Sequence, residues 1–412
     1  MQAGSKSSRK KIPGKKVSGT KAATNKNLDE MPIGDLGIIA LPSSEEMGNK
    51  INNYIVQWRA EREHKCPAHA QMHGYVRENY LIRTETPRFG SGEGKATIFD
   101  SIRGDDIFLL VDVCNYSITY SLRGQVNHMS PDDHFIDLER VIAAIGGKAR
   151  RINVIMPYLY ESRQDRRTMR ESLDCAQALK DLVRMGVENI ITFEAHDLRI
   201  QNAIPLSGFE NFRPIYQFIK GLFRVAPDFE VSPEHLMVVS PDEAGTSRAV
   251  YMANVLGVDM GMFYKRRDYT QTVDGKNPVL AHEFLGTPVE GKDVIIIDDM
   301  ISSGDTVLEI AAELKKHNAA RIFICSTFGV FSNGLEKFDE AYKKGLFHSI
   351  LTTNLSYQRP ELFERSYYHS CDMSKFLALI IDTLNHDGSL SDLLDPVDRI
   401  NTFLKKMNAK RK

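Results

Sequence analysis

The sequence predicts an α/β protein built from two domains in tandem, each with a mainly parallel sheet flanked by helices. Short aliphatic runs recur along the chain, and amphipathic helical stretches lie between many of them. Apolar strands that alternate with helices are typical of parallel sheets covered on both faces. The length of 412 residues also suits two or three domains of ordinary size.

Nine aliphatic runs are predicted as strands: LGIIAL, DIFLLVDV, INVIMP, NIITFEAH, LMVVSP, MGMFYK, DVIIIDD, RIFICSTFG and SILTTN. The clearest helical patterns are DLERVIAAIGG, SLDCAQALKDLVRMG, SRAVYMANVLG and TVLEIAAELKKH. Nine strands are too many for one small sheet, so we place a domain join near GFENFRPIY. We expect a disordered basic tail at 1–34, domains at 35–212 and 213–390, and a C-terminal tail at 391–412.

The composition is that of an ordinary globular protein, with 42% hydrophobic and 26% charged residues. There is no apolar run long enough to span a bilayer and no signal-peptide pattern, so a cytoplasmic location without membrane association is expected. The five cysteines are scattered and odd in number. A chain of this length can build its own core, so no disulfide framework is expected.

Charge is distributed unevenly along the chain. Residues 1–26 carry eight Lys or Arg and no acidic residue, so the formal net charge of −1 leaves −9 for the remainder. A body this acidic is a poor nucleic-acid binder, and any affinity for polyanions is expected in the tail. The tail also lacks apolar periodicity, which predicts disorder.

The stretch VIIIDDMISSGDT, from Val294 to Thr306, joins a buried strand, two carboxylates and a small-residue loop. Ligands of open α/β sheets bind at the carboxyl ends of strands. Gly304 and its neighbours let backbone N–H groups turn inward at a helix N-terminus, which makes a phosphate cradle. Asp298 and Asp299 beside it suit a pair of ribose hydroxyls. The plainer alternative is an acidic strand end followed by an ordinary helix cap.

Two further strand ends carry polar side chains of functional type. The segment ESRQDRRTMRES brings Arg163, Gln164 and Arg166 together after INVIMP, and arginine forks match phosphate oxygens. Its alternative is a solvated charged loop. His196 lies between two acidic residues after another strand, where it can meet a divalent metal or a metal-bound phosphate. Its alternative is a loop histidine that is simply hydrogen-bonded.

Three other segments complete the set of candidates. Asp242, in SPDEAG, directly follows a strand. Lys265 and Arg267, in FYKRRDYT, end a strand and begin a long polar stretch, and a mobile loop with such cations can close over a phosphoryl group. Phe89 and Glu93 lie on the glycine-rich RFGSGEGK, where they can present a ring and an acceptor to a base. The alternative for this last segment is a hairpin with a glycine turn.

Two observations limit other kinds of site. His64, Cys66, His69 and His73 are spaced loosely like metal ligands, but no second half such as paired CxxC motifs follows, so we favour incidental clustering. The chain also lacks the Gly-x4-Gly-Lys-Ser/Thr loop, so any ATP must be held in another way.

Taken in order, these motifs resemble those of ribose-phosphate diphosphokinases, also called phosphoribosyl pyrophosphate synthetases. RFGSGE, RQDRR, a histidine after a strand, SPD, KRR and VIIIDDMISSGDT follow one another at compatible spacing, from Leu36 to about Leu384. The resemblance implies two tandem phosphoribosyltransferase-like domains and a homo-oligomer built from dimers, commonly a hexamer. It also implies ATP and ribose 5-phosphate as substrates and Mg²⁺ as cofactor. Many family members respond to phosphate and ADP.

The resemblance further implies transfer of the diphosphoryl group of ATP to the anomeric hydroxyl of ribose 5-phosphate, which gives phosphoribosyl pyrophosphate and AMP. The implied catalytic cations are Lys265 and Arg267. The implied ATP-binding residues, of which the first two contact adenine from a neighbouring subunit, are Phe89, Glu93, Arg163, Gln164, Arg166 and His196. The implied ribose 5-phosphate residues are Asp298, Asp299, Ser302, Ser303, Gly304 and Thr306. The implied metal ligands are His196 and Asp242.

The sequence also departs from the family pattern. The sugar-phosphate loop of the family commonly reads DDMIDTGGT, whereas here Ser302 replaces the third Asp and Asp305 replaces a Gly. A carboxylate facing a bound phosphate at 4 Å would cost about 4 kcal/mol at an effective dielectric of about 20. Ser91 and Glu194 replace common aspartates. The segment 116–133 is longer than an ordinary βα loop and is predicted to be an insertion.

Three functions are therefore compared. The first is an active diphosphokinase, indicated by the retained cationic and acidic motifs. The second is a non-catalytic homologue that binds nucleotide and regulates an active partner subunit, indicated by the altered loop and the insertion. The third is a phosphoribosyltransferase, which uses the same DD loop but is usually a single domain of this type.

Overall fold

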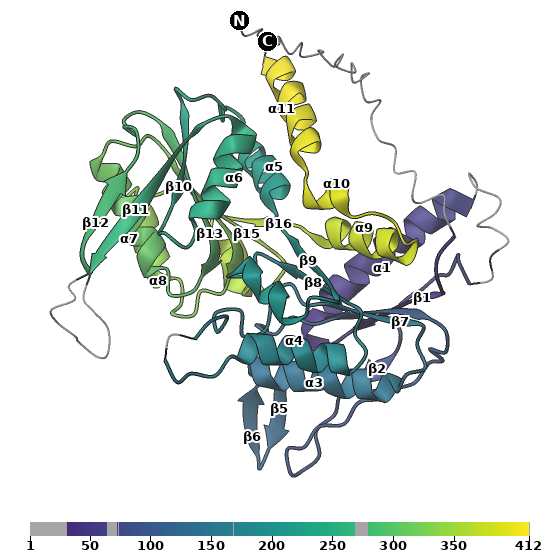
Figure 1. The fold of residues 1–412 in the computed structure, drawn as a ribbon. Helices are drawn as coiled ribbons and strands as arrows, with labels where there is room; N and C mark the ends of the chain where they lie inside the picture. The colour runs from purple at the N-terminus through teal and green to yellow at the C-terminus, as the bar shows by residue number, and fades with distance from the viewer. Residues whose placement is uncertain (1–30, 64–71, 73, 168, 268–278, 412) are drawn as a thin grey trace, which may run out of the picture.

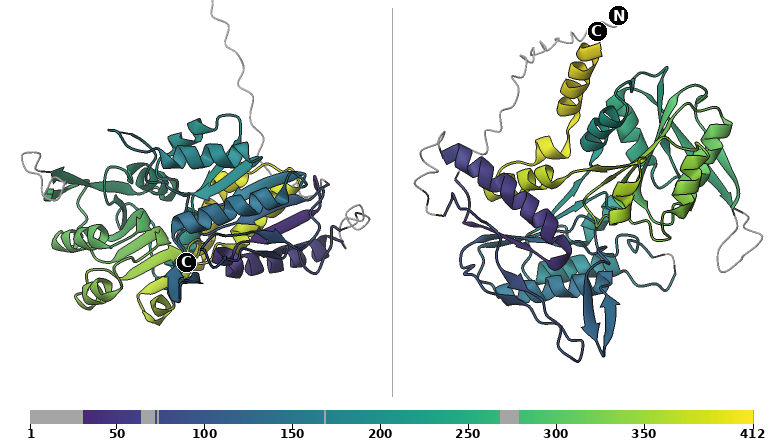
Figure 2. Two further views of the ribbon diagram at one scale, coloured as in Figure 1. Left: turned by 90° about the horizontal axis from the view of Figure 1, so that it is seen from below. Right: turned by 180° about the vertical axis from the view of Figure 1, so that it is seen from behind.

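The computed structural model describes residues 31–63, 72, 74–167, 169–267 and 279–411. These residues form two α/β halves, each built on one large sheet, and two small hairpins (Figure 1). The halves lie against each other rather than apart, as the two further views confirm (Figure 2). The basic tail and the His64–His73 pattern lie outside the described residues, apart from Met72 and the last residues of the predicted tail.

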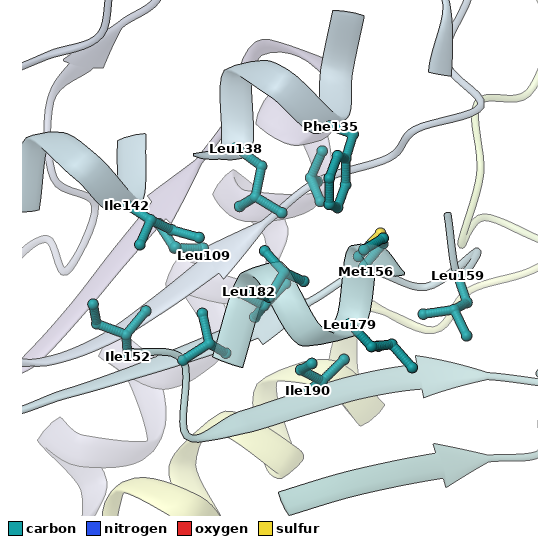
Figure 3. Close-up of a cluster of buried hydrophobic side chains, with 14 of the residues drawn as sticks. Leu109, Phe135, Leu138, Ile142, Ile152, Met156, Leu159, Leu179, Leu182 and Ile190 are labelled. Atoms are coloured by element: carbon teal, nitrogen blue, oxygen red, sulfur yellow. The ribbon is translucent and has the colours of Figure 1, made fainter. Parts of the chain in front are cut away.

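The N-terminal sheet has five parallel strands in chain order. They are β1 (Leu36–Ala40), β4 (Asp106–Leu110), β7 (Arg151–Ile155), β8 (Asn189–Phe193) and β9 (Gly208–Phe212). Helices α3 (Pro131–Ile145) and α4 (Asp174–Arg184) cover one face. Their Leu, Ile and Phe side chains interlock with strand residues such as Leu109 and Ile190 in a closed apolar core (Figure 3).

Local sequence explains why α3 begins and ends where it does. Ser130 and Asp133 form a capping box, in which each side chain accepts the other residue's backbone N–H. Pro131 fits the first helical position because its missing N–H needs no partner there. Gly146 ends the helix in the left-handed conformation that suits glycine. Strong caps of this kind fix the helix on the sheet next to the insertion.

The C-terminal sheet has seven strands, all parallel except for the antiparallel edge strand β12. In spatial order they are β12 (Val279–Leu285), β11 (Asp259–Arg267), β10 (Leu236–Ser240), β13 (Asp293–Ile301), β14 (Ile322–Gly329), β15 (Ser349–Thr353) and β16 (Tyr368–Cys371). Helices α7 (Asp305–Lys316) and α8 (Glu336–Lys343) cover one face. The other face carries α5 (Ile215–Val225), α6 (Thr246–Leu256) and α11 (Val397–Arg411).

Each half lends a helix to the other. Helix α5 follows the last strand of the N-terminal sheet but packs on β15 and β16 of the C-terminal sheet. Helix α9 (Ser374–Asn385) follows β16 but packs beside α1 (Glu45–Glu63) on the N-terminal sheet. Buried ion pairs fasten α9 there, because Asp382 accepts from Arg59 at 3.2 Å and also from Arg62. Asn385 bonds to Arg59 and to Asp106 of β4. The two halves are therefore interlocked.

The remaining described elements are short. The segment 116–133 contains the hairpin β5 (Thr119–Leu122) and β6 (Gln125–His128), whose turn residues Arg123 and Gly124 both have positive φ, as a tight hairpin turn requires. A second small pair is β2 (Thr84–Glu85) and β3 (Thr97–Ile98). Three 3₁₀ helices also occur, η2 (Pro42–Ser44), η3 (Leu198–Ala203) and η4 (Pro360–Glu364). Helix α10 (Ser391–Leu394) precedes α11.

The predicted α/β class, the nine predicted strands and the four quoted helices are confirmed. The domain bounds stay a prediction. Helix α9 falls within the predicted domain 213–390 but packs on the N-terminal sheet. The segment 391–412, expected as a tail, instead contains two helices, and Ile400 of α11 is completely buried against the C-terminal half. The polar composition of VDRINTFLKKMNAKR, with few apolar residues, gave little indication of this helix.

Candidate functional site

The loop after β13 is arranged as a cradle. Asp298 and Asp299 lie near the end of β13, which runs on to Ile301 before the turn Ser302–Gly304 leads into α7. Their side chains are partly exposed, at 18% and 24%. The helix begins one residue earlier than expected, at Asp305. The carboxylates therefore lie beside a helix N-terminus, whose N–H groups attract anions.

Gly304 is required at its position by two separate constraints. Its φ is +84°, a left-handed conformation that side chains rarely adopt. A Cβ atom at this position would lie 2.1 Å from the ring of Phe338 in α8, far inside contact distance. The turn is thus held tightly against α8, and its shape is set by the fold rather than by a ligand.

Asp305 faces away from the cradle. Its carboxylate forms an ion pair at 2.5 Å with Lys337 of α8. The hydrogen bonds from Lys337 and Ser303 hold the pKa of Asp305 below its usual range. The residues on either side, Gly304 and Thr306, line the cavity next to the loop, whereas Asp305 does not. The carboxylate that interrupts the family pattern is therefore neutralised outside the phosphate cradle.

A cavity of about 300 Å³ opens between the two halves at this loop. We call it the candidate catalytic cavity. It brings together nine of the predicted site residues: Arg163, His196, Asp242, Asp298, Asp299, Ser302, Ser303, Gly304 and Thr306. The first two come from the ends of β7 and β8, and the others from the ends of β10 and β13. The site thus lies where strand ends of both sheets converge.

Arg248 of α6 also lines this cavity, although its sequence pattern did not indicate a site residue. Its side chain is only 9% exposed, and its Nε donates to Glu194 at 2.8 Å. Its two terminal nitrogens lie 3.6 Å from Asp298 and 3.7 Å from Asp299. Burial, followed by the charge of Asp299, raises the pKa of Asp298 well above its ordinary value, and Arg248 opposes that shift. Arg248 therefore joins the two halves through Glu194 and also lies near two carboxylates of its own half.

His196 is oriented by the neighbouring RQDRR segment. Its Nδ1 lies 2.8 Å from Asp165 Oδ2, and its backbone N–H donates to Ser162. A carboxylate on one ring nitrogen directs the other nitrogen toward a ligand, as in many metal sites. Oδ1 of Asp165 is buried without a hydrogen-bond partner among the described residues. Asp242 stabilises its own turn by accepting from the N–H of Gly245 at 3.0 Å.

The other predicted ATP residues are spread over neighbouring surfaces. Arg166 lines an adjacent cavity of about 320 Å³ that shares Glu194, His196 and Arg248 with the first. Gln164 donates to the carbonyl of Ser172 and so braces its own loop.

Phe89 and Glu93 do not line the candidate catalytic cavity of their own chain. They lie on a glycine turn closed by a backbone hydrogen bond from Phe89 to Glu93, and the Phe89 ring is 55% exposed. This turn is the hairpin considered as the alternative, so the adenine-binding role of Phe89 and Glu93 stays a prediction.

The predicted catalytic cations lie at the end of β11, next to the edge strand β12 of the C-terminal sheet. The backbones of Lys265 and Arg267 pair with His282 and Val279 of β12, with an irregularity between Arg266 and Arg267. Strand β11 ends at Arg267 as expected, whereas β12 in the following polar stretch was not anticipated. The side chains of these cations lie outside the described residues, so their catalytic role stays a prediction.

None of the described helices is long and apolar enough to cross a membrane.

Comparisons with known proteins agree with this architecture. Residues 36–186 match the family model described as the N-terminal domain of ribose phosphate pyrophosphokinase, and residues 225–364 match the phosphoribosyl transferase domain. The chain is 26% identical over 313 residues to a ribose-phosphate pyrophosphokinase of Mycoplasmopsis pulmonis, covering 74% of this chain and 86% of that protein. It is 29% identical over 285 residues to that of Prochlorococcus marinus, covering 67% and 76%.

A solved structure shows the same fold. The phosphoribosylpyrophosphate synthetase from Mycobacterium smegmatis superposes with a TM-score of 0.64 at 21% identity, over 86% of this chain and 100% of that one. Two phosphoribosyltransferase-like halves in tandem define the class of protein. Within that class, the chain belongs to the ribose-phosphate pyrophosphokinase family.

Proposed function

We propose that this protein transfers the diphosphoryl group of ATP to the 1-hydroxyl of ribose 5-phosphate. The hydroxyl oxygen bonds to the β-phosphorus, the bond to the oxygen bridging the α- and β-phosphorus breaks, and AMP leaves while the hydroxyl proton passes to solvent. The carrying observation is the cradle of Asp298, Asp299 and Gly304 facing Arg163 and His196 across one cavity. A sugar phosphate and a polyphosphate can meet there directly.

Each part of the cavity has a defined task in this proposal. The N–H groups of the loop, with Ser303 and Thr306, bind the 5-phosphate, and Asp298 and Asp299 accept from ribose hydroxyls. Arg163 binds phosphate oxygens of ATP. The transition state of phosphoryl transfer is loose and spreads charge over nonbridging oxygens, so positioning and cations supply most of the catalysis. In this scheme Lys265 and Arg267 provide the cations that close over the transferred group.

Magnesium is the proposed cofactor. The described residues contain no group of three or more His, Cys, Asp or Glu side chains that could hold a metal by themselves. Mg²⁺ usually takes one or two carboxylates and completes its shell with water and substrate phosphates, so Asp242 and His196 beside a phosphate cradle fit it. When bound, it would neutralise charge on the phosphate oxygens of ATP.

We further propose a cytoplasmic homo-oligomer, built from dimers and commonly a hexamer in this family. Support comes from the exposed Phe89 ring, which is outside the cavity of its own chain and so suits a site on a neighbouring subunit.

The test is incubation of the purified protein with ATP, Mg²⁺ and ribose 5-phosphate, followed by phosphorus NMR. We expect AMP and phosphoribosyl pyrophosphate, with none above background from a Lys265→Ala control. ATP binding without turnover, together with co-assembly with an active enzyme, would instead support the regulatory alternative. Release of pyrophosphate as the phosphoribosyl group passes to a base, when phosphoribosyl pyrophosphate and that base are supplied, would support a phosphoribosyltransferase.

A further inference from the structure

The two halves repeat one succession of elements. Strands β1, β4, β7, β8 and β9 follow one another across the N-terminal sheet, as β10, β13, β14, β15 and β16 do across the C-terminal sheet. The connections between these strands also correspond. Helices α1, α3 and α4 in the first set take the places of α6, α7 and α8 in the second, and η3 takes the place of η4. The exchanged helices α5 and α9 then follow the last strand of each set. Each of the five strands in one series therefore has a counterpart in the other.

The candidate catalytic cavity has such a counterpart. A cavity of about 540 Å³ opens at the carboxyl ends of β1 and β4, which correspond to β10 and β13. We call it the twin cavity. Asp112, just after β4, corresponds in position to Asp298 at the end of the apolar part of β13. Ser43, after β1, corresponds to Asp242, after β10. The other half again supplies one wall, here from the ends of β15 and β16.

The twin cavity lacks what a phosphate needs. The described part of its lining contains no arginine, and the small-residue cradle has no equivalent because the β5–β6 hairpin follows β4 instead. Besides Asp112, three acidic residues line it, Glu45, Glu46 and Asp372, against one lysine. That lysine, Lys50, is already bonded to Glu46 at 2.6 Å. A phosphorylated ligand would be repelled.

The twin cavity instead offers hydroxyl and amide groups beside aromatic rings. Ser356 lies between the halves, is 5% exposed, and its Oγ has no hydrogen-bond partner among the described residues. A buried hydroxyl left in this state is costly unless something in the cavity completes its bonding. Asn115 and Gln358 provide amides, and Tyr357 and Phe363 provide apolar faces. Such a lining suits a ligand with several hydroxyls and a flat ring.

We propose that the twin cavity binds an uncharged, hydroxyl-bearing molecule of nucleoside size, with Ser356 as one of its hydrogen-bond partners. The site is separate from the candidate catalytic cavity, so its occupancy can be measured without turnover. Residues of both halves line the twin cavity, as they do the candidate catalytic cavity, so the bound molecule contacts both halves.

Calorimetric titration of the full-length protein tests this proposal, with adenosine and adenosine 5′-monophosphate as probes and ATP present at saturation to block the catalytic cavity. We expect adenosine to bind one to one and the monophosphate at least tenfold more weakly, because the lining carboxylates repel it. Ser356→Ala should weaken adenosine binding several-fold. The same change should raise the thermal midpoint of the ligand-free protein, since it removes an unpaired buried hydroxyl.

Thr383→Val is the matched control, because Thr383 also carries a buried, unpartnered hydroxyl but does not line the twin cavity. It should raise the midpoint without changing adenosine binding. No binding of adenosine, equal binding of both probes, or unchanged adenosine affinity in Ser356→Ala would each overturn the proposal.

Discussion

The two halves share the same order of five parallel strands, but the loops and side chains at the ends of these strands differ. In the C-terminal half, β13 delivers Asp298 and Asp299 to an open cavity and leads into a glycine turn at a helix N-terminus. In the N-terminal half, the oxygens of Asp112 after β4 accept the backbone N–H groups of Cys114 and Tyr357. A five-strand parallel series thus provides a place for a ligand, and the loop after the second strand decides which chemistry that place accepts.

The largest expected effect comes from removing the charge that the C-terminal half places in its cavity. Arg248→Met leaves Glu194 and two aspartates without their buried cation, and breaking one side of a buried ion pair costs about 3–5 kcal/mol. Chemical denaturation should show that loss in the free energy of unfolding, with turnover abolished. Arg184→Met, which removes an exposed ion pair on α4, should cost less than about 1 kcal/mol. Similar losses in both variants would contradict a central role for Arg248.

The second prediction concerns the glycine turn after β13, which has no equivalent in the N-terminal half. Gly304→Ala must displace Phe338 or the loop, and overpacking of this kind costs about 1–3 kcal/mol, besides the strain of a positive φ. We expect affinity for ribose 5-phosphate, measured by calorimetry, to fall at least about tenfold. Gly291 has a similar positive φ of +74° but open space around it, so Gly291→Ala should leave the affinity unchanged. Equal affinities in the two variants would show that the cradle is not rigid.

The third prediction concerns the N-terminal counterpart, Asp112. Burial raises its pKa from 3.8 to about 7, although two backbone N–H groups oppose the shift. The folded protein then retains a proton that the unfolded chain has lost between about pH 4 and pH 7, so this group makes stability fall as pH rises through that window. The slope reaches about 1.4 kcal/mol per pH unit. Denaturation at pH 5, 6, 7 and 8 should show a flatter profile in Asp112→Asn; an unchanged slope would exclude this assignment.

The smallest expected effect concerns Asp305. Lys337→Ala should free its carboxylate and raise the KM for ribose 5-phosphate by up to about fivefold, because exposed ion pairs contribute little. The double variant Asp305→Asn, Lys337→Ala should restore the original KM. A KM that stays high in the double variant would mean that Lys337 acts on the substrate rather than through Asp305. Raised salt should reduce the effect of the single change.

Much of this organisation was predictable because the chemistry sits at the ends of aliphatic strands. Asp242 and Asp298 were identified in this way, and the structure brings them into one cavity. Arg248 was not, since a single arginine in an amphipathic helix looks like a solvated residue, and its burial arises only when the halves meet. A weak signal existed, because Arg248 lies in the first turn of a helix that directly follows the SPDEAG turn. The strand Gly208–Phe212 was missed because GFENF has no aliphatic run and is held by its neighbour β8.

Side-chain patterns also could not reveal which sheet a helix covers. SKFLALIIDTLN reads as an apolar helix in any context, yet α9 leaves its own half to cover α1 and the N-terminal sheet. The orientation of Asp305 was equally hidden, because it depends on Lys337, which is distant in sequence.

The exchange of α5 and α9 has a consequence for synthesis. A ribosome releases the chain from its N-terminus, so the N-terminal sheet emerges long before the residues of α9 that cover it. Until then the part of α1 and of the N-terminal sheet that α9 covers lacks this native partner and is available to chaperones. A gene split between the halves would likewise yield two fragments that each carry the other's missing helix. The two halves are thus synthesised one after the other, but neither can complete its packing until the other is present.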